Sequence, residues 1–287
     1  MRVLKSNFRS VVKPPKKLGA DPVDCPSMKM PDVGILVVSC DRYADLWEPF
    51  FHCFFKYWKD CPYPVYLGTN TLTYADKRVQ SLPIGTDISY CDNLRLMLRM
   101  VKQDWVIFWV EDRILADRIE TTRVEELVSE AKSKNAAYLK LIPQHALAYL
   151  VPGRNCGEVP RGSHYRVSMT IALWQKQCLN SLLRPGETAW QLEKLGSRRS
   201  DEMPAPFLSL APKYRTKPVL PHVHIIVKGR LIRSARSFLA KEGFAGSLTK
   251  RQLESMRSSL YIKVYHILLA PLWAVQYMLL SKIKGKW

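Results

Sequence analysis

Trp105-Val-Ile-Phe-Trp-Val-Glu111-Asp112-Arg113 is the stretch from which the architecture of this chain is most easily inferred. Its first six residues are all β-branched or aromatic, a composition typical of a buried strand. Two carboxylates follow with no turn residue in between. In open α/β sheets, ligands bind beyond the carboxyl ends of the strands, where carboxylates suit a divalent metal and a phosphorylated substrate. Two solvated acids at a strand end are an equally good interpretation of this segment alone.

Strand-like and helix-like segments alternate on both sides of this stretch. The other predicted strands are 33–39, 64–68 and 137–142, and the predicted helices are 45–58, 92–102 (capped by Asp92) and 121–134. This β-α-β-α-β-α-β order predicts an α/β fold with a mostly parallel sheet flanked by helices. A loop-rich stretch over 143–165 then leads into a predicted strand at 165–174 and a short helix at 175–183.

A second acidic cluster lies in Pro185-Gly-Glu187-Thr-Ala-Trp190-Gln-Leu-Glu193. Because these three side chains are spaced by three residues, we expect them to share one helix face. The cluster is either a capping glutamate with a core tryptophan, or a carboxylate beside an aromatic wall, as in many sugar-binding sites. His222-Val-His224 is expected to be a structural pair on a strand.

The positive charge of the chain is concentrated at its two ends. The net charge is +19, but residues 1–30 hold seven Lys or Arg and two acids, and residues 211–287 hold fifteen and two. Nucleic-acid enzymes usually carry their basic residues around the active cleft, whereas here the middle of the chain is nearly neutral. The pattern predicts a globular catalytic body held on an anionic membrane surface, and no nucleic-acid partner.

The C-terminal segment has its own signature. Between Lys263 and Lys282 lie 18 residues without Asp, Glu, Lys or Arg, interrupted by Pro271. A helix of this length spans about 27 Å, short of the ~30 Å hydrocarbon core, which predicts a helix on the membrane surface or a shallow re-entrant hairpin. A helix packed on the catalytic core is the alternative. The expected organisation is a basic irregular arm over 1–30, a catalytic domain over 31–230, and a basic, helical, membrane-associating tail over 231–287.

The cysteines indicate the compartment. None of the seven is part of a C-x-x-C pair, and their number is odd, so neither a disulfide framework nor a zinc site is expected. A reducing environment is the simplest inference. Together with the basic tail, this predicts a cytoplasmic protein that is peripheral on the inner face of the plasma membrane.

Six short pieces occur in a distinctive order: Val37–Tyr43, Trp47–Trp58, Pro62–Tyr66, Asp92–Leu94, Val110–Asp112, and Glu187–Trp190 with Glu193. Together they resemble GT-A-fold nucleotide-sugar glycosyltransferases of the bacterial cell-surface polysaccharide type. The resemblance covers about residues 31–230. It implies transfer of a sugar from a nucleotide-sugar donor to a lipid-linked or polysaccharide acceptor.

The resemblance also implies roles for individual residues. It assigns Glu111 and Asp112 to a bound Mn²⁺ or Mg²⁺ on the donor diphosphate, and Glu187 or Glu193 to the general base that deprotonates the acceptor hydroxyl. It places Asp41 and Arg42 near the nucleotide base and includes Asp92 and Asn93 among the matching residues. With Arg113 and Trp190, which are expected from their chemistry, these are the predicted donor-binding residues.

One position departs from the family's pattern. The family usually offers two carboxylates separated by one residue, whereas this chain has Glu111-Asp112-Arg113. Arg113 cannot bind a metal, but its guanidinium presents donors suited to a phosphate. A non-catalytic relative that binds or scaffolds other components of envelope polysaccharide assembly is therefore the alternative function.

Overall fold

The structure, a computed structural model, describes residues 32–143, 154–246, 248 and 251–254. The predicted N-terminal arm over 1–30 and the uncharged segment over 264–281 lie outside these residues. In the described part of the chain, no helix is long and apolar enough to cross a membrane.

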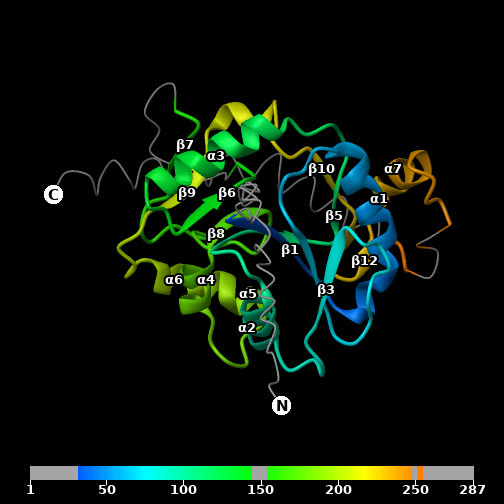
Figure 1. The fold of residues 1–287 in the computed structure, drawn as a ribbon, viewed down its shortest axis with the longest axis horizontal. Coiled ribbons are helices and arrows are strands. Elements are labelled where there is room, and N and C mark those ends of the chain that lie inside the picture. Colours follow the sequence, from blue (N-terminus) through cyan, green and yellow to red (C-terminus); the bar gives the residue numbers. More distant parts are fainter. Residues whose placement is uncertain (1–31, 144–153, 247, 249–250, 255–287) are drawn as a thin grey trace, which may run out of the picture. The chain divides into compact units, whose positions relative to one another are not determined.

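An eight-stranded sheet in the order β3-β2-β1-β4-β8-β6-β9-β7 forms the centre of the fold (Figure 1). Its strands are β1 (Val33–Val38), β2 (Val65–Thr69), β3 (Val79–Pro83), β4 (Trp105–Val110), β6 (Tyr138–Lys140), β7 (Cys156–Glu158), β8 (Ala172–Gln175) and β9 (Phe207–Leu210). Only β8 and β7 run against the other strands. The predicted α/β fold with a mostly parallel sheet flanked by helices is confirmed.

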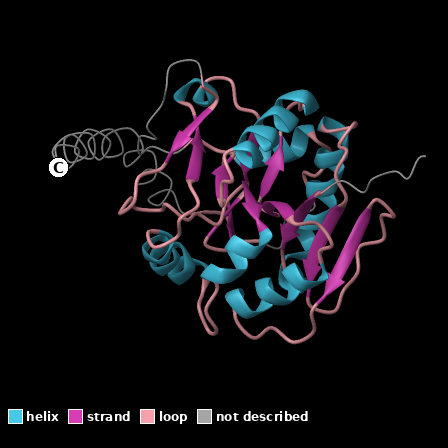
Figure 2. Ribbon diagram, turned by 60° about the vertical axis from the view of Figure 1, so that its left-hand side comes forward, coloured by secondary structure: helices cyan, strands magenta, loops and turns pink. Residues whose placement is uncertain are grey.

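Helices cover both faces of this sheet (Figure 2). The helices of the described chain are η1 (Asp41–Leu46), α1 (Trp47–Tyr57), α2 (Tyr90–Met100), α3 (Thr121–Ser133), α4 (Lys176–Leu182), α5 (Ala189–Gln191), η2 (Leu192–Gly196), α6 (Ser197–Ser200), η3 (Pro212–Arg215) and α7 (Ala235–Lys241). α1 and α3 pack on one face of the sheet, and α2 and α4 pack on the other.

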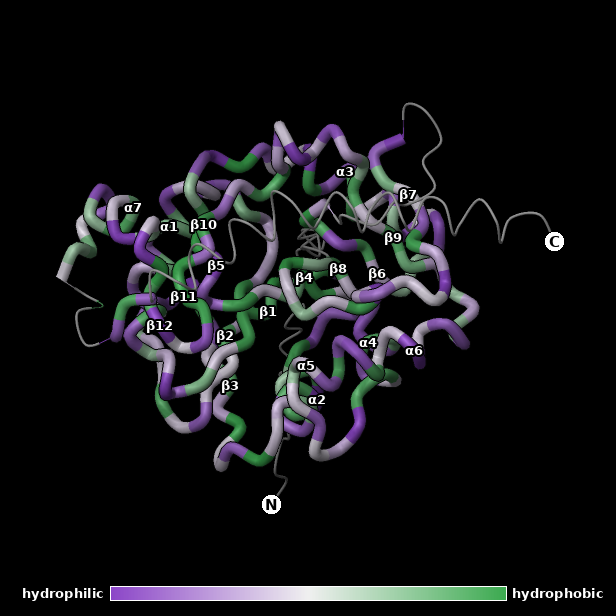
Figure 3. The backbone as a smooth tube through the Cα atoms, turned by 180° about the vertical axis from the view of Figure 1, so that it is seen from behind, coloured by the Kyte–Doolittle hydropathy of each residue, from purple (hydrophilic) through white to green (hydrophobic). Residues whose placement is uncertain are grey.

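β4 shows why the central strands are almost wholly hydrophobic. Ile107 and Trp109 enter the core beneath α1 and α3, whereas Val106 and Phe108 enter the core beneath α2 and α4. Successive side chains of a strand point to opposite faces, so a strand covered on both sides needs apolar residues at every position. The strands at the centre of the sheet are accordingly among the most hydrophobic parts of the chain (Figure 3).

Two small antiparallel pairs extend the fold beside the end of β4. β5 (Arg113–Leu115) pairs with β10 (His222–His224), and β11 (Ile226–Val227) pairs with β12 (Arg230–Leu231). The first pair brings residues that are more than 100 positions apart into register.

The structure corrects four local predictions. The edge strands β3 and β7 were not predicted, because polar residues and a glycine interrupt their apolar pattern. The strand predicted over 165–174 is only Ala172–Gln175 and runs antiparallel to β4. The side chain of Ser89, not of Asp92, caps α2 by accepting a hydrogen bond from the Asp92 amide. Glu187 precedes the short helix α5, whose cap is Thr188, so it shares no helix face with Trp190 and Glu193.

Candidate functional site

A cavity of about 680 Å³ lies at the carboxyl end of β4. The end of β4, the loop after β1, the start of α2, and the β10–β11 segment all contribute to its walls. Glu111, Asp112 and Arg113 line it together, and Trp190 from α5 and Glu193 from η2 line it as well. The structure therefore brings the first acidic cluster and part of the second, Trp190 and Glu193, to one cavity.

Glu111 is the most deeply buried carboxylate of the cavity, with 8% of its surface exposed. Burial, followed by the neighbouring charge of Asp112, raises the pKa of Glu111 to about 8. A cation beside this carboxylate would favour its charged form. The environment of Glu111 is thus one in which proton binding and cation binding compete.

Asp112 is held by the neighbouring strand β10. His224 Nε2 lies 3.1 Å from Asp112 Oδ2, and the backbone N–H of Ile225 donates to the Asp112 carbonyl at 2.9 Å. The other carboxylate oxygen, Oδ1, is buried and receives no hydrogen bond from any described residue. Such an orphaned acceptor is costly unless a ligand satisfies it.

Arg113 opens β5 and pairs in register with His224. Its Nη1 lies 3.2 Å from Nε2 of His222, and the Nδ1 of that histidine is 2.8 Å from the carbonyl of Leu220. Burial lowers the pKa of His222 to about 4, so its imidazole is neutral near pH 7. Arg113 therefore presents its charge to the cavity beside an uncharged histidine.

Glu193 lies on the wall of the cavity that η2 forms. Its Oε1 accepts hydrogen bonds from the Met169 amide at 2.7 Å and from the Ser168 hydroxyl at 3.1 Å. Within the described residues nothing donates to Oε2, so the carboxylate is oriented and one oxygen remains available. Trp190 is 77% exposed although it lines the cavity, so it is not the core tryptophan of the first alternative.

Glu187 has a different environment from Glu193 and is not among the residues that line the cavity. Its two carboxylate oxygens accept from both terminal nitrogens of Arg199, at 2.9 and 2.6 Å. The Glu187 carbonyl also accepts a hydrogen bond from the amide of Cys91. These contacts tie α6 to α2, which is a structural use of the carboxylate.

Of the predicted donor-binding residues, Asn93, Arg113 and Trp190 line the cavity, whereas Asp41, Arg42 and Asp92 do not. Asn93 lines the cavity and donates to Asp87, which also lines it. Asp92 does not line it; this carboxylate accepts from the Ser89 hydroxyl and from the Gly186 amide, 2.6 and 2.9 Å away.

Asp41 and Arg42 are likewise not among the lining residues. The Asp41 carboxylate accepts hydrogen bonds from the amides of Asn70, Thr71 and Leu72 and from the Thr71 hydroxyl. Burial acts to raise the pKa of Asp41, but these hydrogen bonds outweigh it and hold the pKa below its ordinary value. Asp41 therefore fastens the loop after β1 to the loop after β2.

Several lining residues were not predicted from the sequence. They include Ser39, Tyr43, Asp87, Tyr90, His224 and Lys228. The signal for His224 was present in the His-Val-His motif, but its pairing with residues 113–115 could not be read from spacing. The hydroxyl of Tyr90 is buried and has no hydrogen-bond partner among the described residues.

The acidic side chains fit a divalent cation that is shared with a ligand. In the described part of the chain, no three His, Cys, Asp or Glu side chains are gathered as a complete metal site. Mg²⁺-type ions, however, are commonly held by one or two carboxylates together with substrate phosphates. Buried Glu111 and the unpartnered Oδ1 of Asp112 supply such a partial donor set.

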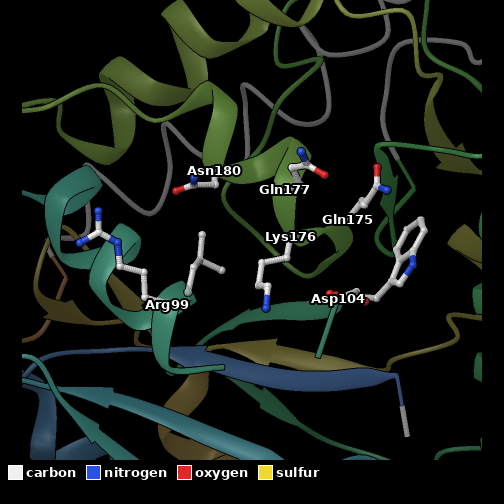
Figure 4. Close-up of a pocket in the computed structure, with 8 residues that line it drawn as sticks. Arg99, Asp104, Gln175, Lys176, Gln177 and Asn180 are labelled. Carbon is white, nitrogen blue, oxygen red and sulfur yellow. The ribbon is translucent and has the colours of Figure 1, made fainter. Parts of the chain in front are cut away.

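A second hollow of about 500 Å³ lies at the opposite end of β4, where Trp105 begins the strand (Figure 4). Arg99, Asp104 and Lys176 line it. Lys176 Nζ donates to the Val101 carbonyl at 2.9 Å, so its charge supports the local backbone. This hollow lacks the adjacent carboxylates of the first cavity.

No family model matches the chain, and no curated protein is similar to it in sequence. Solved structures with a similar fold include residues 1–349 of TarS from S. aureus, at 11% identity and a TM-score of 0.44. That match covers 82% of this chain and 72% of the TarS fragment. The match to a longer TarS structure covers 82% of this chain and 44% of that TarS chain.

The mannosyltransferase PcManGT from Pyrobaculum calidifontis, solved with GDP-Man and Mn²⁺, is also similar, at 13% identity and a TM-score of 0.44. That match covers 96% of this chain and 80% of the mannosyltransferase. The bifunctional IspDF from Campylobacter jejuni is similar over 56% of this chain and 46% of its own, at 11% identity and a TM-score of 0.35. The likeness is one of general architecture, and it does not extend to a donor, an acceptor or a metal.

Proposed function

We propose that the chain is a glycosyltransferase that moves a sugar from a nucleotide-sugar donor to a lipid-linked or polysaccharide acceptor in cell-surface glycan synthesis. The observation that carries this proposal is the cavity beyond β4, in which Glu111 and Asp112 share one space with Glu193 and Trp190. Acidic groups for a diphosphate-bound cation and an oriented carboxylate for an acceptor hydroxyl are the parts that this reaction needs.

Glu111 and Asp112 are the residues that would hold Mn²⁺ or Mg²⁺ together with the donor diphosphate. When bound, the cation supplies charge neutralisation for the leaving diphosphate. Arg113 and Lys228 line the same cavity and add fixed positive charge for the phosphates. His224 supports this arrangement by orienting the Asp112 carboxylate.

Glu193 is the general base in this proposal. Hydrogen bonds from Ser168 and Met169 fix the direction of its carboxylate, and Oε2 is left to take a proton from the acceptor. Glu187 was the other candidate, but its bidentate pairing with Arg199 commits both of its oxygens. A positioned base contributes about 10²–10⁴-fold to such a reaction.

Trp190 supports a saccharide ligand at the mouth of the cavity. Binding sites for small molecules combine aromatic walls with a few placed polar groups, and an exposed indole beside Glu193 offers that combination. In this proposal the protein is peripheral on the inner face of the plasma membrane, where it meets an acceptor on the cytoplasmic side. The uncharged segment over 264–281 would help to attach it there.

A thermal-shift screen tests this proposal. Nucleotide diphosphates and nucleotide sugars, with and without Mn²⁺, should raise the melting temperature, because a ligand that binds only the folded state stabilises it by mass action. Donor hydrolysis by the purified protein then separates a transferase from a non-catalytic relative, which would bind the donor without turning it over. No stabilisation by any nucleotide would contradict both.

A further inference from the structure

The segment from hairpin β11–β12 through helix α7 carries a group of exposed cations, here named the basic face. Its exposed cationic side chains are Lys228, Arg230, Arg233, Arg236 and Lys241. We propose that the basic face docks on an anionic lipid bilayer and holds the mouth of the cavity at the membrane surface. The part of this inference that concerns the acceptor rests on the proposed function.

The positive charge of the basic face is not neutralised by the acids nearest in sequence. Glu242 is 6% exposed, and its carboxylate accepts from Lys56 Nζ at 2.6 Å and from the Tyr57 hydroxyl at 2.7 Å. Glu254 is 3% exposed. Both acids are turned into the fold, whereas the cations remain in solvent. Such a one-signed surface attracts anionic partners.

The basic face adjoins the cavity through the tip of the hairpin. Lys228 and Gly229 both have positive φ, at 49° and 74°, as a tight two-residue hairpin turn requires. Ile226, Val227 and Lys228 all line the cavity. One side of the hairpin therefore borders the candidate active site, and the same hairpin continues into the exposed cations of α7.

The end of the described chain lies against this surface. The Leu231 amide donates to the Gln252 carbonyl, and the Glu254 amide donates to the Leu231 carbonyl, each at 2.9 Å. Arg233 Nε donates to the Glu254 carbonyl at 3.0 Å. Residues 252–254 are thereby fixed beside β12.

The sequence beyond Glu254 supports a bilayer as the partner. Nine residues separate Glu254 from the uncharged segment over 264–281, and the ten Cα–Cα steps between them span at most about 36 Å. The apolar segment therefore begins within that distance of the basic face. Basic attraction next to an apolar segment is the combination that binds anionic membranes, whereas a nucleic acid would use the charge alone.

Vesicle binding by the full-length chain tests the inference. The variant combines Arg230→Glu, Arg236→Glu and Lys241→Glu, and the control combines Lys102→Glu, Lys194→Glu and Arg198→Glu. The control has the same change of charge and also replaces exposed residues. Lys102 follows α2, Lys194 lies in η2 and Arg198 lies in α6. Figures 1 and 3 show α6 and α7 on opposite sides of the sheet.

Each variant is mixed with vesicles of phosphatidylglycerol and phosphatidylcholine, and separately with phosphatidylcholine alone. Each cation near an anionic surface is worth about fivefold in partitioning, and the introduced carboxylates are repelled in addition, so we expect the first variant to lose at least about 100-fold on the mixed vesicles. The control should lose less than about tenfold. Equal losses in both variants, or none in the first, would overturn the inference.

Two further measurements keep the result interpretable. Melting curves check folding, and the double variant Arg236→Gln with Lys241→Gln, confined to exposed positions of α7, replaces the triple variant if that one does not fold. A single-stranded RNA that displaces the protein from vesicles, and whose binding the first variant loses equally, would show a nucleic-acid surface instead. Donor turnover is measured separately with a soluble acceptor, so a failure of the proposed function leaves the vesicle result standing.

Discussion

His224 Nε2 lies 3.1 Å from Oδ2 of Asp112, although the two residues are more than 100 positions apart in the sequence. The contact exists because β10 pairs with β5, which follows directly after the acidic pair. It orients the Asp112 carboxylate so that Oδ2 faces the histidine, while Oδ1 stays buried without a partner among the described residues.

We expect His224→Ala to weaken Mn²⁺-dependent donor binding by about 10–100-fold, the usual effect of removing a group that orients a metal-binding carboxylate. The measurement is a titration of the thermal shift with donor at saturating and at zero Mn²⁺. His52→Ala is the control, because this exposed histidine packs against Phe244 away from the cavity. Equal donor affinity for His224→Ala and wild type would show that the contact serves the fold alone.

Asp112→Asn tests the metal role directly. The amide keeps the size of the side chain but is a much poorer ligand for Mn²⁺ or Mg²⁺. We expect the stabilisation that the metal adds to a nucleotide diphosphate to disappear, while the melting temperature without ligand changes little. If the metal still adds its full shift, Asp112 does not hold it.

The raised pKa of Glu111 makes stability depend on pH in a defined direction. Its pKa is about 8 in the folded protein and near 4.5 in an unfolded chain, so the folded state binds more protons between these values. Stability is therefore lost as the pH rises from 4.5 through 8. We expect Glu111→Gln to melt at a higher temperature than wild type at pH 9 and to differ least near pH 4.

The pKa of His222 is lowered, so its effect on stability depends on pH in the opposite direction to that of Glu111 and can be compared with it. Its pKa is about 4 in the folded protein and near 6.5 unfolded, so its contribution to stability is lost as the pH falls through this window. His222→Gln should flatten the acid side of the melting profile and leave the alkaline side unchanged. A Glu111→Gln variant whose melting profile parallels that of wild type from pH 5 to 9 would contradict the assigned shift.

The sequence predicted the site where a strand leads straight into its functional residues, and failed where distant segments meet. Glu111 and Asp112 were placed correctly at the end of β4, because a run of apolar residues ends there without a turn. Glu187 was misplaced because Thr188 caps the following helix, and a three-residue spacing gives no information on where a helix begins.

The edge strands β3 and β7 also depend on contacts with distant segments, which their own sequences do not reveal. β3 and β7 have mixed composition because they are covered on fewer sides than β4, so their pattern resembles that of a loop. Their pairing partners, not their own residues, make them strands. The cavity wall formed by His224 and Lys228 could not be predicted for the related reason that it depends on the register of β10 with β5.

Glu193→Gln and Glu187→Gln form a matched pair that separates chemistry from stability. We expect Glu193→Gln to lower turnover by about 10²–10⁴-fold with little change in donor binding, since a base acts mainly in the transition state. Glu187→Gln should instead destabilise the fold, because it leaves Arg199 without its carboxylate.

The size of the second effect can be bounded. Breaking a buried ion pair costs about 3–5 kcal/mol, and the side chains of Glu187 and Arg199 are 12% and 22% exposed, so we expect a loss near or below the lower end of this range. Denaturant unfolding measures it, and donor turnover below the melting transition should be retained.

If Glu193→Gln turns over donor at the wild-type rate, the base lies elsewhere.

Deletion of residues 258–287 tests the role of the C-terminal tail. This segment contains the uncharged stretch over 264–281 and lies beyond the described residues, so the contacts that fix Leu231 to Gln252 and Glu254 remain in the shortened chain. We expect the truncated protein to move from the membrane fraction to the soluble fraction and to keep donor-induced stabilisation. High salt should release the intact protein only in part, because salt screens the basic attraction and leaves the apolar contribution. A truncated protein that no longer melts cooperatively would place the segment in the core of the catalytic domain and remove its membrane role.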